Sequence, residues 1–284
     1  MKRNFPMHET AMAETVVHPT AVIGAGVSLG LGVTIGPYAV VGDGATIGDG
    51  TTLAAHAIVC AGAVIGSGTR IHSFAVVGGD PQDLGFDPAT QSGVTVGAGV
   101  TIREGVTINR ATKAGGRTTI GDGVYLMANS HVGHDSHVGD RVILANNVML
   151  AGHVEVGAAA FLGGGAGVHQ FARIGEGTMV SGNASMSYDA PPHTIVAERN
   201  CLIGLNLVGL RRRGTEAAVI ADLKRCFRAV FAESGDVRRN ANSAIASGEV
   251  GTTAPGAGFL SFCASGKRGF ARLRRRSDGG AGPS

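Results

Sequence analysis

The chain has 284 residues, of which 44% are hydrophobic and 47 are glycine, and it contains no Trp, three Tyr and ten Phe. This composition excludes a largely disordered chain and predicts a core of aliphatic rather than aromatic side chains. The N-terminal residues lack the apolar core of a signal peptide, and no stretch approaches the ~20 apolar residues of a membrane-spanning helix. We therefore expect a cytoplasmic protein that does not span a membrane.

Cysteine usage and charge narrow the function classes further. The four cysteines are far apart and form no Cys-x-x-Cys pair, which fits a reducing compartment and indicates neither a zinc site nor a redox site. The formal charge of +3 hides an asymmetry, because Asn206 to Ser284 holds 14 Lys and Arg against 6 Asp and Glu. The C-terminal part is therefore predicted to dock something acidic. Nucleic acid, an anionic membrane and an acidic protein all fit, and charge alone does not choose between them.

A six-residue period follows an N-terminal extension over residues 1–14 and extends through residues 15–195. An aliphatic residue opens each of 26 hexads, and the residue four places later is Val, Ala, Thr or Ser in every hexad except the one that the first interruption breaks, where it is Pro81. That small residue and the next aliphatic one are two apart, so both point inward from an extended strand. Apolar spacing of six with intervening glycine does not fit a helix. Interruptions near residues 78–93 and 113–118 predict two loops.

The C-terminal region, residues 196–284, has a different pattern. Apolar residues at three- and four-residue steps between Ile220 and Phe231 predict one amphipathic helix. The Gly-, Thr- and Ala-rich stretch from Gly248 to Gly258 is typical of a linker, and a short basic helix is expected between Phe259 and Arg276. Ser277 to Ser284 is expected to be a frayed tail.

The hexad pattern resembles that of the hexapeptide-repeat acyltransferases. The resemblance implies an all-β left-handed parallel β-helix with three flat faces and three hexads per coil, followed here by a small α-helical C-terminal domain. The left-handed winding comes from the resemblance alone, since parallel crossovers are right-handed in ~98% of cases. Each coil is supported by its neighbours, and the end coils need covering.

Five histidines cluster between His131 and His169, although a repeat of small residues has no structural need for imidazole. With three hexads per coil, His134 stacks on Gly152, beside His153, and Gly152 stacks on Gln170, beside His169. We therefore expect these histidines along one edge of the prism. Asp135 follows His134, and a carboxylate beside an imidazole fixes its tautomer, as a general base requires. Solvated corner residues are the plain alternative, and a zinc site like that of trimeric β-helix carbonic anhydrases is a second one.

Local sequence then resembles one family, the UDP-N-acetylglucosamine O-acyltransferases that begin lipid A biosynthesis. The resemblance covers about residues 15–235, and its most specific segments are Gln82–Leu84, Leu126–Asp135, Leu144–Asn147, Leu150–Val154, Val168–Phe171, Pro191–Pro192 and Gly204–Gly214. It implies that His134 takes the proton of the sugar 3-hydroxyl as this attacks the thioester of an (R)-3-hydroxyacyl group on acyl carrier protein. Asp135 would orient the imidazole, and the N–H of Gly152 would face the oxyanion. No cofactor and no metal are implied.

The same resemblance implies further site residues and a homotrimer with active sites between neighbouring prisms. Gly182 matches the position that ends the acyl-chain groove, and glycine there favours a longer chain. The positions that match substrate contacts or a functionally important histidine are Asp83, His131, His153, His169, Gln170, Asn206, Arg212 and Arg213. The arginines suit a diphosphate, and the basic C-terminal region suits an acidic acyl carrier protein rather than nucleic acid.

Three departures from the family pattern leave the sugar nucleotide open. Gly85 replaces a common lysine, Asn109 stands where relatives often have His, and Val208 stands where a relative carries an acidic residue. An acyltransferase that uses the 3-amino sugar nucleotide is therefore one alternative. A related sugar N-acyltransferase is disfavoured because the hexads begin by Val17, which leaves no room for its N-terminal uridine-binding domain. A non-catalytic or ice-binding β-solenoid would show regular Thr ladders and no edge of histidines.

Overall fold

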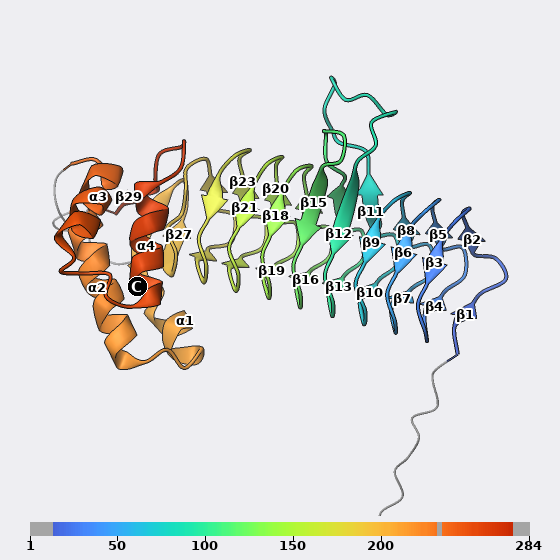
Figure 1. The fold of residues 1–284 in the computed structure, drawn as a ribbon, viewed down its shortest axis with the longest axis horizontal. Coiled ribbons are helices and arrows are strands. Elements are labelled where there is room, and N and C mark those ends of the chain that lie inside the picture. The colour runs from blue at the N-terminus through green and yellow to red at the C-terminus, as the bar shows by residue number, and fades with distance from the viewer. Residues whose placement is uncertain (1–13, 232–234, 275–284) are drawn as a thin grey trace, which may run out of the picture.

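The computed structural model describes residues 14–231 and 235–274. It has an elongated three-sided prism of short strands with a group of helices at its C-terminal end (Figure 1). The predicted N-terminal extension, except for Glu14, and the predicted tail Ser277–Ser284 lie outside the described residues.

Three sheets, A, B and C, form the faces of the prism, and the chain visits them in that order in each coil. Sheet A contains β1 (Val16–Val17), β4 (Thr34–Ile35), β7 (Thr52–Leu53), β10 (Arg70–Ile71), β13 (Thr101–Ile102), β16 (Tyr125–Leu126), β19 (Ile143–Leu144), β22 (Phe161–Leu162), β25 (Met179–Val180), β27 (Thr194–Ala197), β28 (Cys201–Leu205) and β29 (Arg272–Leu273). Sheet B contains β2 (Val22–Ile23), β5 (Val40–Val41), β8 (Ile58–Val59), β11 (Val76–Gly79), β14 (Thr107–Asn109), β17 (His131–Val132), β20 (Met149–Leu150), β23 (Gly167–Val168) and β26 (Ser185–Met186). Sheet C contains β3 (Ser28–Leu29), β6 (Thr46–Ile47), β9 (Val64–Ile65), β12 (Gly93–Val96), β15 (Arg117–Ile120), β18 (His137–Val138), β21 (Glu155–Val156) and β24 (Arg173–Ile174).

Strands on successive coils pair in parallel, and outside the loops their partners are three hexads apart along the chain. His131 lies beside Met149, and Val132 lies beside Leu150. The second residue of nearly every strand is buried, and the small residue two places before it is buried as well, as with Val33 and Ile35. The predicted left-handed parallel β-helix and its aliphatic column are therefore confirmed.

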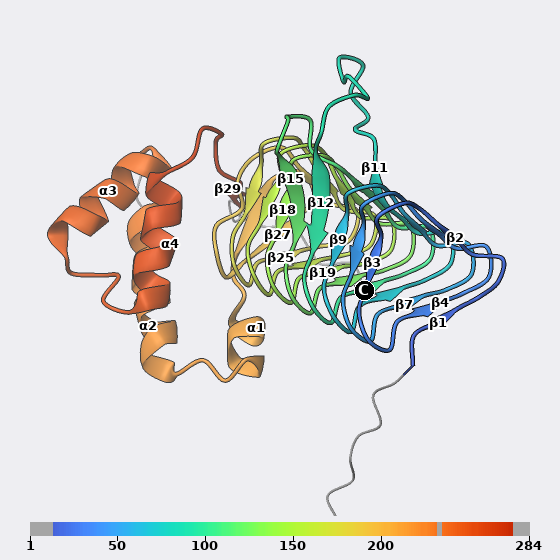
Figure 2. The same ribbon diagram turned by 45° about the vertical axis from the view of Figure 1, so that its right-hand side comes forward.

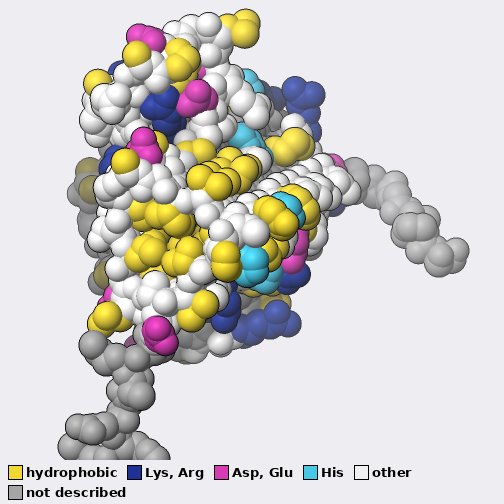
Figure 3. All heavy atoms as spheres, turned by 90° about the vertical axis from the view of Figure 1, so that its right-hand side faces the viewer, with side chains coloured by type: hydrophobic (Ala, Val, Ile, Leu, Met, Phe, Trp, Pro, Cys, Tyr) yellow, Lys and Arg dark blue, Asp and Glu magenta, His cyan; other side chains and the backbone are white. Residues whose placement is uncertain are grey.

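The first coil is the exception to this burial. Val17 and Ile23 occupy inward positions, yet they are 39% and 37% exposed, whereas Ile35 on the next coil is 1% exposed. Figure 3 shows hydrophobic side chains gathered at this end of the prism. An inward side chain in this solenoid is thus buried by the adjacent coils as well as by its own, as repeat architectures require.

Two connections leave the prism at the corner between sheets B and C. The longer one joins β11 to β12 and the shorter one joins β14 to β15, and both project to the same side (Figure 2). The chain returns to register after each, since Ile71 pairs with Ile102 and Ile102 pairs with Leu126. We call residues 80–92 the first loop and residues 110–116 the second loop.

Helices α1 (Leu207–Arg212), α2 (Ala217–Phe231), α3 (Val237–Ser247) and α4 (Ala254–Ala264) follow the prism, and β29 then pairs with β28. The predicted amphipathic helix is α2, which buries Leu223 and Val230. None of the helices in the described ranges combines the length and apolar character needed to cross a membrane.

Two predictions for the C-terminal region are wrong. The expected linker Gly248–Gly258 contains the start of α4, and the expected basic helix ends at Ala264 instead of reaching Arg276. Buried Asp222 explains the helix start, because it accepts hydrogen bonds from the N–H and hydroxyl of Thr253, the N-cap of α4. A Cβ on Gly256 would lie 2.2 Å from Asp222, so the glycine provides close approach between helices rather than flexibility.

Candidate active site

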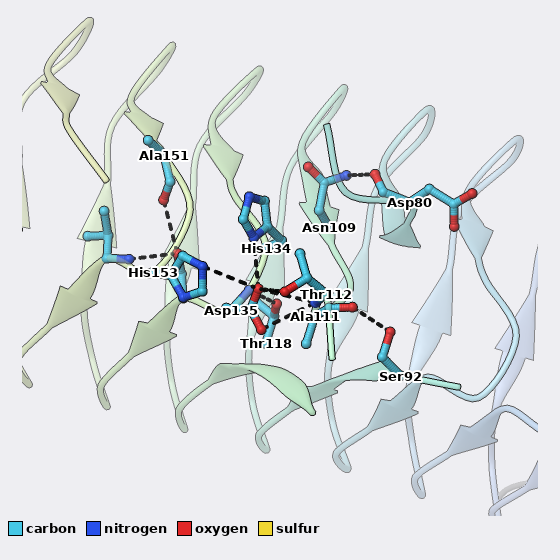
Figure 4. A network of polar contacts seen from close by, with 12 residues as sticks. Asp80, Ser92, Asn109, Ala111, Thr112, Thr118, His134, Asp135, Ala151 and His153 are labelled. Atoms are coloured by element: carbon cyan, nitrogen blue, oxygen red, sulfur yellow. Dashed lines mark hydrogen bonds and ion pairs between the residues drawn. The ribbon is translucent and has the colours of Figure 1, made fainter. Parts of the chain in front are cut away.

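The register of three hexads per coil brings the histidines together at the corner between sheets B and C. His134, Gly152 and Gln170 follow the paired strands β17, β20 and β23 at equivalent places. The next residue on each coil has a left-handed backbone conformation, with φ of 57° at Asp135 and 59° at His153. This conformation turns the chain sharply, and the side chains of His134, Asp135 and His153 lie close together in Figure 4.

Asp135 lies between two imidazoles. Its Oδ2 is 2.8 Å from Nδ1 of His134 and 3.7 Å from Nε2 of His153, and the His134 and Asp135 side chains are only 15% and 16% exposed. Burial raises the pKa of Asp135, but hydrogen bonds from His134 and Thr112 outweigh this and lower it overall. The ionised carboxylate accepts a hydrogen bond from Nδ1–H of His134, which leaves Nε2 of that ring free to accept a proton.

Gly152 lies directly against the free side of this ring. A Cβ at residue 152 would be 2.5 Å from both Cε1 and Nε2 of His134, so only glycine fits without moving the imidazole. Among the described residues, no acceptor takes a hydrogen bond from the N–H of Gly152. A free backbone donor therefore lies beside a free basic nitrogen.

A groove of about 770 Å³ leads from this corner along sheet B. His131 lies in it, and its ring hydrogen-bonds to Thr107 through a 2.7 Å contact between Nδ1 and Oγ1. Burial, with a smaller effect of His134, lowers the pKa of His131. Other residues that line the groove are Gln82, Asn109, His134, Met149, Gly152, Gly167, His169, Gln170, Ser185 and Arg199.

A second cavity, of about 740 Å³, lies on the sheet C side of the same corner. It is lined by Asp135, His153 and Phe171 and by Lys267 and Arg268 of the segment that follows α4. The His153 and Phe171 rings stack with centroids 4.5 Å apart. Burial lowers the pKa of His153, and repulsion from His134 adds to this, although Asp135 acts in the opposite direction. The two cavities thus meet at the corner that carries His134 and Asp135.

Comparison with known proteins identifies the family. The model described as "Bacterial transferase hexapeptide (six repeats)" matches residues 28–61, 44–79 and 117–152, and "Udp N-acetylglucosamine O-acyltransferase; Domain 2" matches residues 189–271. The structure of UDP-N-acetylglucosamine acyltransferase from Campylobacter jejuni is 38% identical, has a TM-score of 0.83, and the match covers 91% of this chain and 100% of that one. The chain belongs to the UDP-N-acetylglucosamine O-acyltransferase family.

Other members of this family support the assignment. The Arabidopsis UDP-N-acetylglucosamine acyltransferase structure is 33% identical with a TM-score of 0.80, and the match covers 91% of this chain and 99% of that one. Acyl-[acyl-carrier-protein]–UDP-N-acetylglucosamine O-acyltransferases from Sinorhizobium medicae and Rhizobium etli are 39% and 47% identical over 107 and 81 residues. These alignments cover 37% and 28% of this chain, and they span 39% and 30% of the relatives' length.

In this family member, some predicted site residues lie away from the corner that carries His134 and Asp135. Asn206 caps α1, where its Oδ1 accepts from Gly209 N and its Nδ2 donates to Gly177 O. Arg212 and Arg213 are exposed at the end of α1, and a Cβ on Gly177 would lie 2.6 Å from Arg213. Because Gly177 joins β24 to β25, these residues lie at the corner between sheets C and A.

Asp83 and Gly182 are also separate from the histidines. Asp83 is exposed in the first loop and accepts a hydrogen bond from Gly85 N, while its neighbour Gln82 lines the groove. Gly182 lies at the corner between sheets A and B, where it approaches Gly164. The Gln82–Leu84 motif pointed to Gln82 as a site residue. No sequence pattern identified Thr112, which forms a hydrogen bond with Asp135.

The same corner has donor atoms that a metal could use. Atoms of His134, Asp135 and His153 lie within 4.8 Å of one another, and two imidazoles with a carboxylate are common zinc ligands. However, a metal at this place would have to replace the 2.8 Å hydrogen bond between His134 and Asp135. The arrangement is that of a histidine oriented by a carboxylate, and the absence of a metal from the reaction stays a prediction.

Proposed function

We propose that the protein transfers an (R)-3-hydroxyacyl group from acyl carrier protein to the 3-hydroxyl of UDP-N-acetylglucosamine, the first step of lipid A biosynthesis. The observation that carries this is the half-buried His134 and Asp135 pair, whose free imidazole nitrogen lies against Gly152 at the groove. Family membership and the names of the Sinorhizobium and Rhizobium relatives support the donor and the acceptor.

The chemistry needs one general base and no covalent enzyme intermediate. Nε2 of His134 takes the proton of the sugar 3-hydroxyl while the oxygen attacks the thioester carbonyl carbon. The C–S bond then breaks, and the proton passes from the imidazolium to the departing thiolate, which gives an ester and a free thiol. Ionised Asp135 stabilises the imidazolium between these two steps.

Gly152 would stabilise the oxyanion of the tetrahedral intermediate. Its N–H is a donor without an acceptor among the described residues, and it lies next to the ring that accepts the proton. A fixed backbone donor at this place lowers the barrier without reorganisation. His131, His169 and Gln170 line the same groove and would contact the sugar nucleotide.

A homotrimer would complete this site. Asn206, Arg212 and Arg213 lie at a different corner of the prism from His134, so in this proposal they contact the nucleotide bound to a neighbouring subunit. A row of outward side chains on sheet A supports such packing, because Tyr125, Ile143, Phe161 and Met179 pair in sequence along it. The corresponding row on sheet C is polar or charged.

Partner and chain length follow from the same proposal. The basic region from Asn206 to the C-terminus would steer the acidic acyl carrier protein toward the second cavity, where Lys267 and Arg268 lie. Gly182 would end the acyl groove beyond Ser185 and leave space for a longer chain. The cytoplasmic location expected from the sequence belongs to this proposal.

The decisive experiment is His134→Ala in an assay of acyl transfer from acyl carrier protein, with both the 3-hydroxyl and the 3-amino sugar nucleotide. Loss of the base should lower turnover roughly 10²-fold or more while the melting temperature is retained. His18→Ala is the matched control, because His18 is exposed in the first coil and contacts Thr20 rather than Asp135. Unchanged turnover in folded His134→Ala would reject the mechanism, and faster transfer to the 3-amino nucleotide would reassign the acceptor.

A further inference from the structure

The second loop and the strand residue just after it both form hydrogen bonds with Asp135. The backbone N–H of Thr112 lies 3.2 and 3.1 Å from the two carboxylate oxygens of Asp135, and the Thr112 hydroxyl donates to Oδ2 over 2.8 Å. Thr118, just after the loop, accepts a hydrogen bond from the Asp135 N–H over 2.8 Å. The catalytic carboxylate is therefore held through its backbone and through its side chain by one connection (Figure 4).

The first loop contacts the residues at the start of the second loop and holds them in place. Arg110 forms an ion pair with Asp80 over 2.8 Å and stacks over the Phe86 ring, with 4.8 Å from Cζ to the centroid. Asn109 donates to the Asp80 carbonyl over 2.7 Å. The hydroxyl of Ser92 donates to the carbonyl of Ala111, the residue before Thr112. These contacts lock the backbone that presents Thr112 to Asp135.

The position of the carboxylate matters because two imidazoles compete for the same oxygen. Oδ2 is the acceptor for His134 at 2.8 Å and is 3.7 Å from His153. A rotation of the Asp135 side chain would bring this oxygen nearer to His153 and would release Nδ1 of His134. The Thr112 hydroxyl donates to this same Oδ2 and opposes that rotation.

We propose that Thr112 is a positioning residue, which acts through Asp135 to keep His134 in the tautomer with a free Nε2. The proposal rests on the proposed function, since it assigns Thr112 to the same base. It also gives the second loop a role: the chain leaves the prism at residue 110 in order to bring a hydroxyl and an N–H to the catalytic carboxylate.

A double-mutant cycle tests whether Thr112 acts through Asp135. Thr112→Val keeps the shape and the N–H but removes the hydroxyl, so kcat should fall about ten-fold with little change in KM. Thr112→Ser should recover most of the loss. In an Asp135→Ala background, Thr112→Val should change kcat by less than about two-fold. An equal ten-fold loss in that background would overturn the proposal, because the threonine would then act without the carboxylate.

A spectroscopic measurement separates this proposal from the proposed function. Nitrogen chemical shifts of ¹⁵N-labelled histidine report the His134 tautomer, and the signal is identified by its loss in His134→Ala. We expect Thr112→Val to mix the two tautomers, whereas Thr119→Val, which affects the exposed His137, leaves them unchanged. An unmixed His134 signal in folded Thr112→Val would overturn the positioning role. If His134→Ala retained full turnover while Thr112→Val still mixed the tautomers, the proposed function would fail and the positioning role would stand.

Discussion

Substitution of Gly152 by alanine is expected to disable His134, the proposed base, without unfolding the protein. The added Cβ would lie 2.5 Å from Cε1 and Nε2 of His134 and 3.1 Å from its Cδ2, whereas ordinary van der Waals contact begins at 3.4 Å. The imidazole would therefore have to retreat by roughly 1 Å, while Asp135 holds it from the other side at 2.8 Å. A misplacement of about 1 Å at a reacting group costs on the order of 10²-fold in rate.

The fold should tolerate this change, because Gly152 does not have the left-handed conformation that favours glycine. The assay is steady-state acyl transfer at saturating nucleotide, with a thermal melt of each variant. Gly258→Ala, a change in open space on α4, is the control and should leave kcat unchanged. If Gly152→Ala kept kcat within about three-fold of the parent, the close packing of residue 152 on His134 would not be needed for catalysis, and the reasoning would be refuted.

Three further outcomes follow from the structure. Arg212→Ala should raise KM for the sugar nucleotide with little change in kcat, and a binding titration identical to the parent would reject the arginine as a phosphate contact. Phe161→Glu should convert the proposed trimer to monomers in light scattering, whereas Thr46→Glu on sheet C should leave the trimer intact. Trimers in both variants would remove sheet A from the proposed interface. Burial lowers the pKa of His193; Glu176 acts in the opposite direction, and repulsion from Arg213 adds a smaller lowering. As the pH falls below 6.5, the unfolded chain therefore binds more protons at residue 193 than the folded protein does. The free energy of unfolding, measured by denaturant titration, should thus fall as the pH is lowered from 7.5 to 5.5. It should fall less steeply in the His193→Asn variant.

Sequence reasoning placed His134 next to Gly152 and His153 because the solenoid converts a difference in residue number into a position in space. His134 and Gly152 are three hexads apart and therefore touch, which needed no knowledge of the side-chain contacts. The same reasoning failed where the chain leaves the repeat. Thr112 reaches Asp135 only through the path of the second loop, and that path depends on contacts between the two loops.

The C-terminal helices show a second limit. A glycine-rich stretch is typical of a linker. Position 256, however, requires glycine because α4 packs so closely against Asp222 of α2 that a Cβ would clash with it. Thr253 and Pro255 are local signals of a helix start, but the contact of the Thr253 N-cap with a buried carboxylate 31 residues earlier has no local signal. Asn206 could likewise be matched to a family position but not placed, because its corner is set by how α1 leaves the prism.

The fixed pitch of the prism also governs where its length can change. One residue inserted into an ordinary coil would shift every later corner out of step with the coil before it and would expose the aliphatic column. The coils that carry the loops take 31 residues from Arg70 to Thr101 and 24 from Thr107 to His131, yet the pairing on either side is intact. Both loops lie at the same corner, so changes in loop length there can remodel the rim of the groove while His134, Gly152 and Gln170 stay in phase.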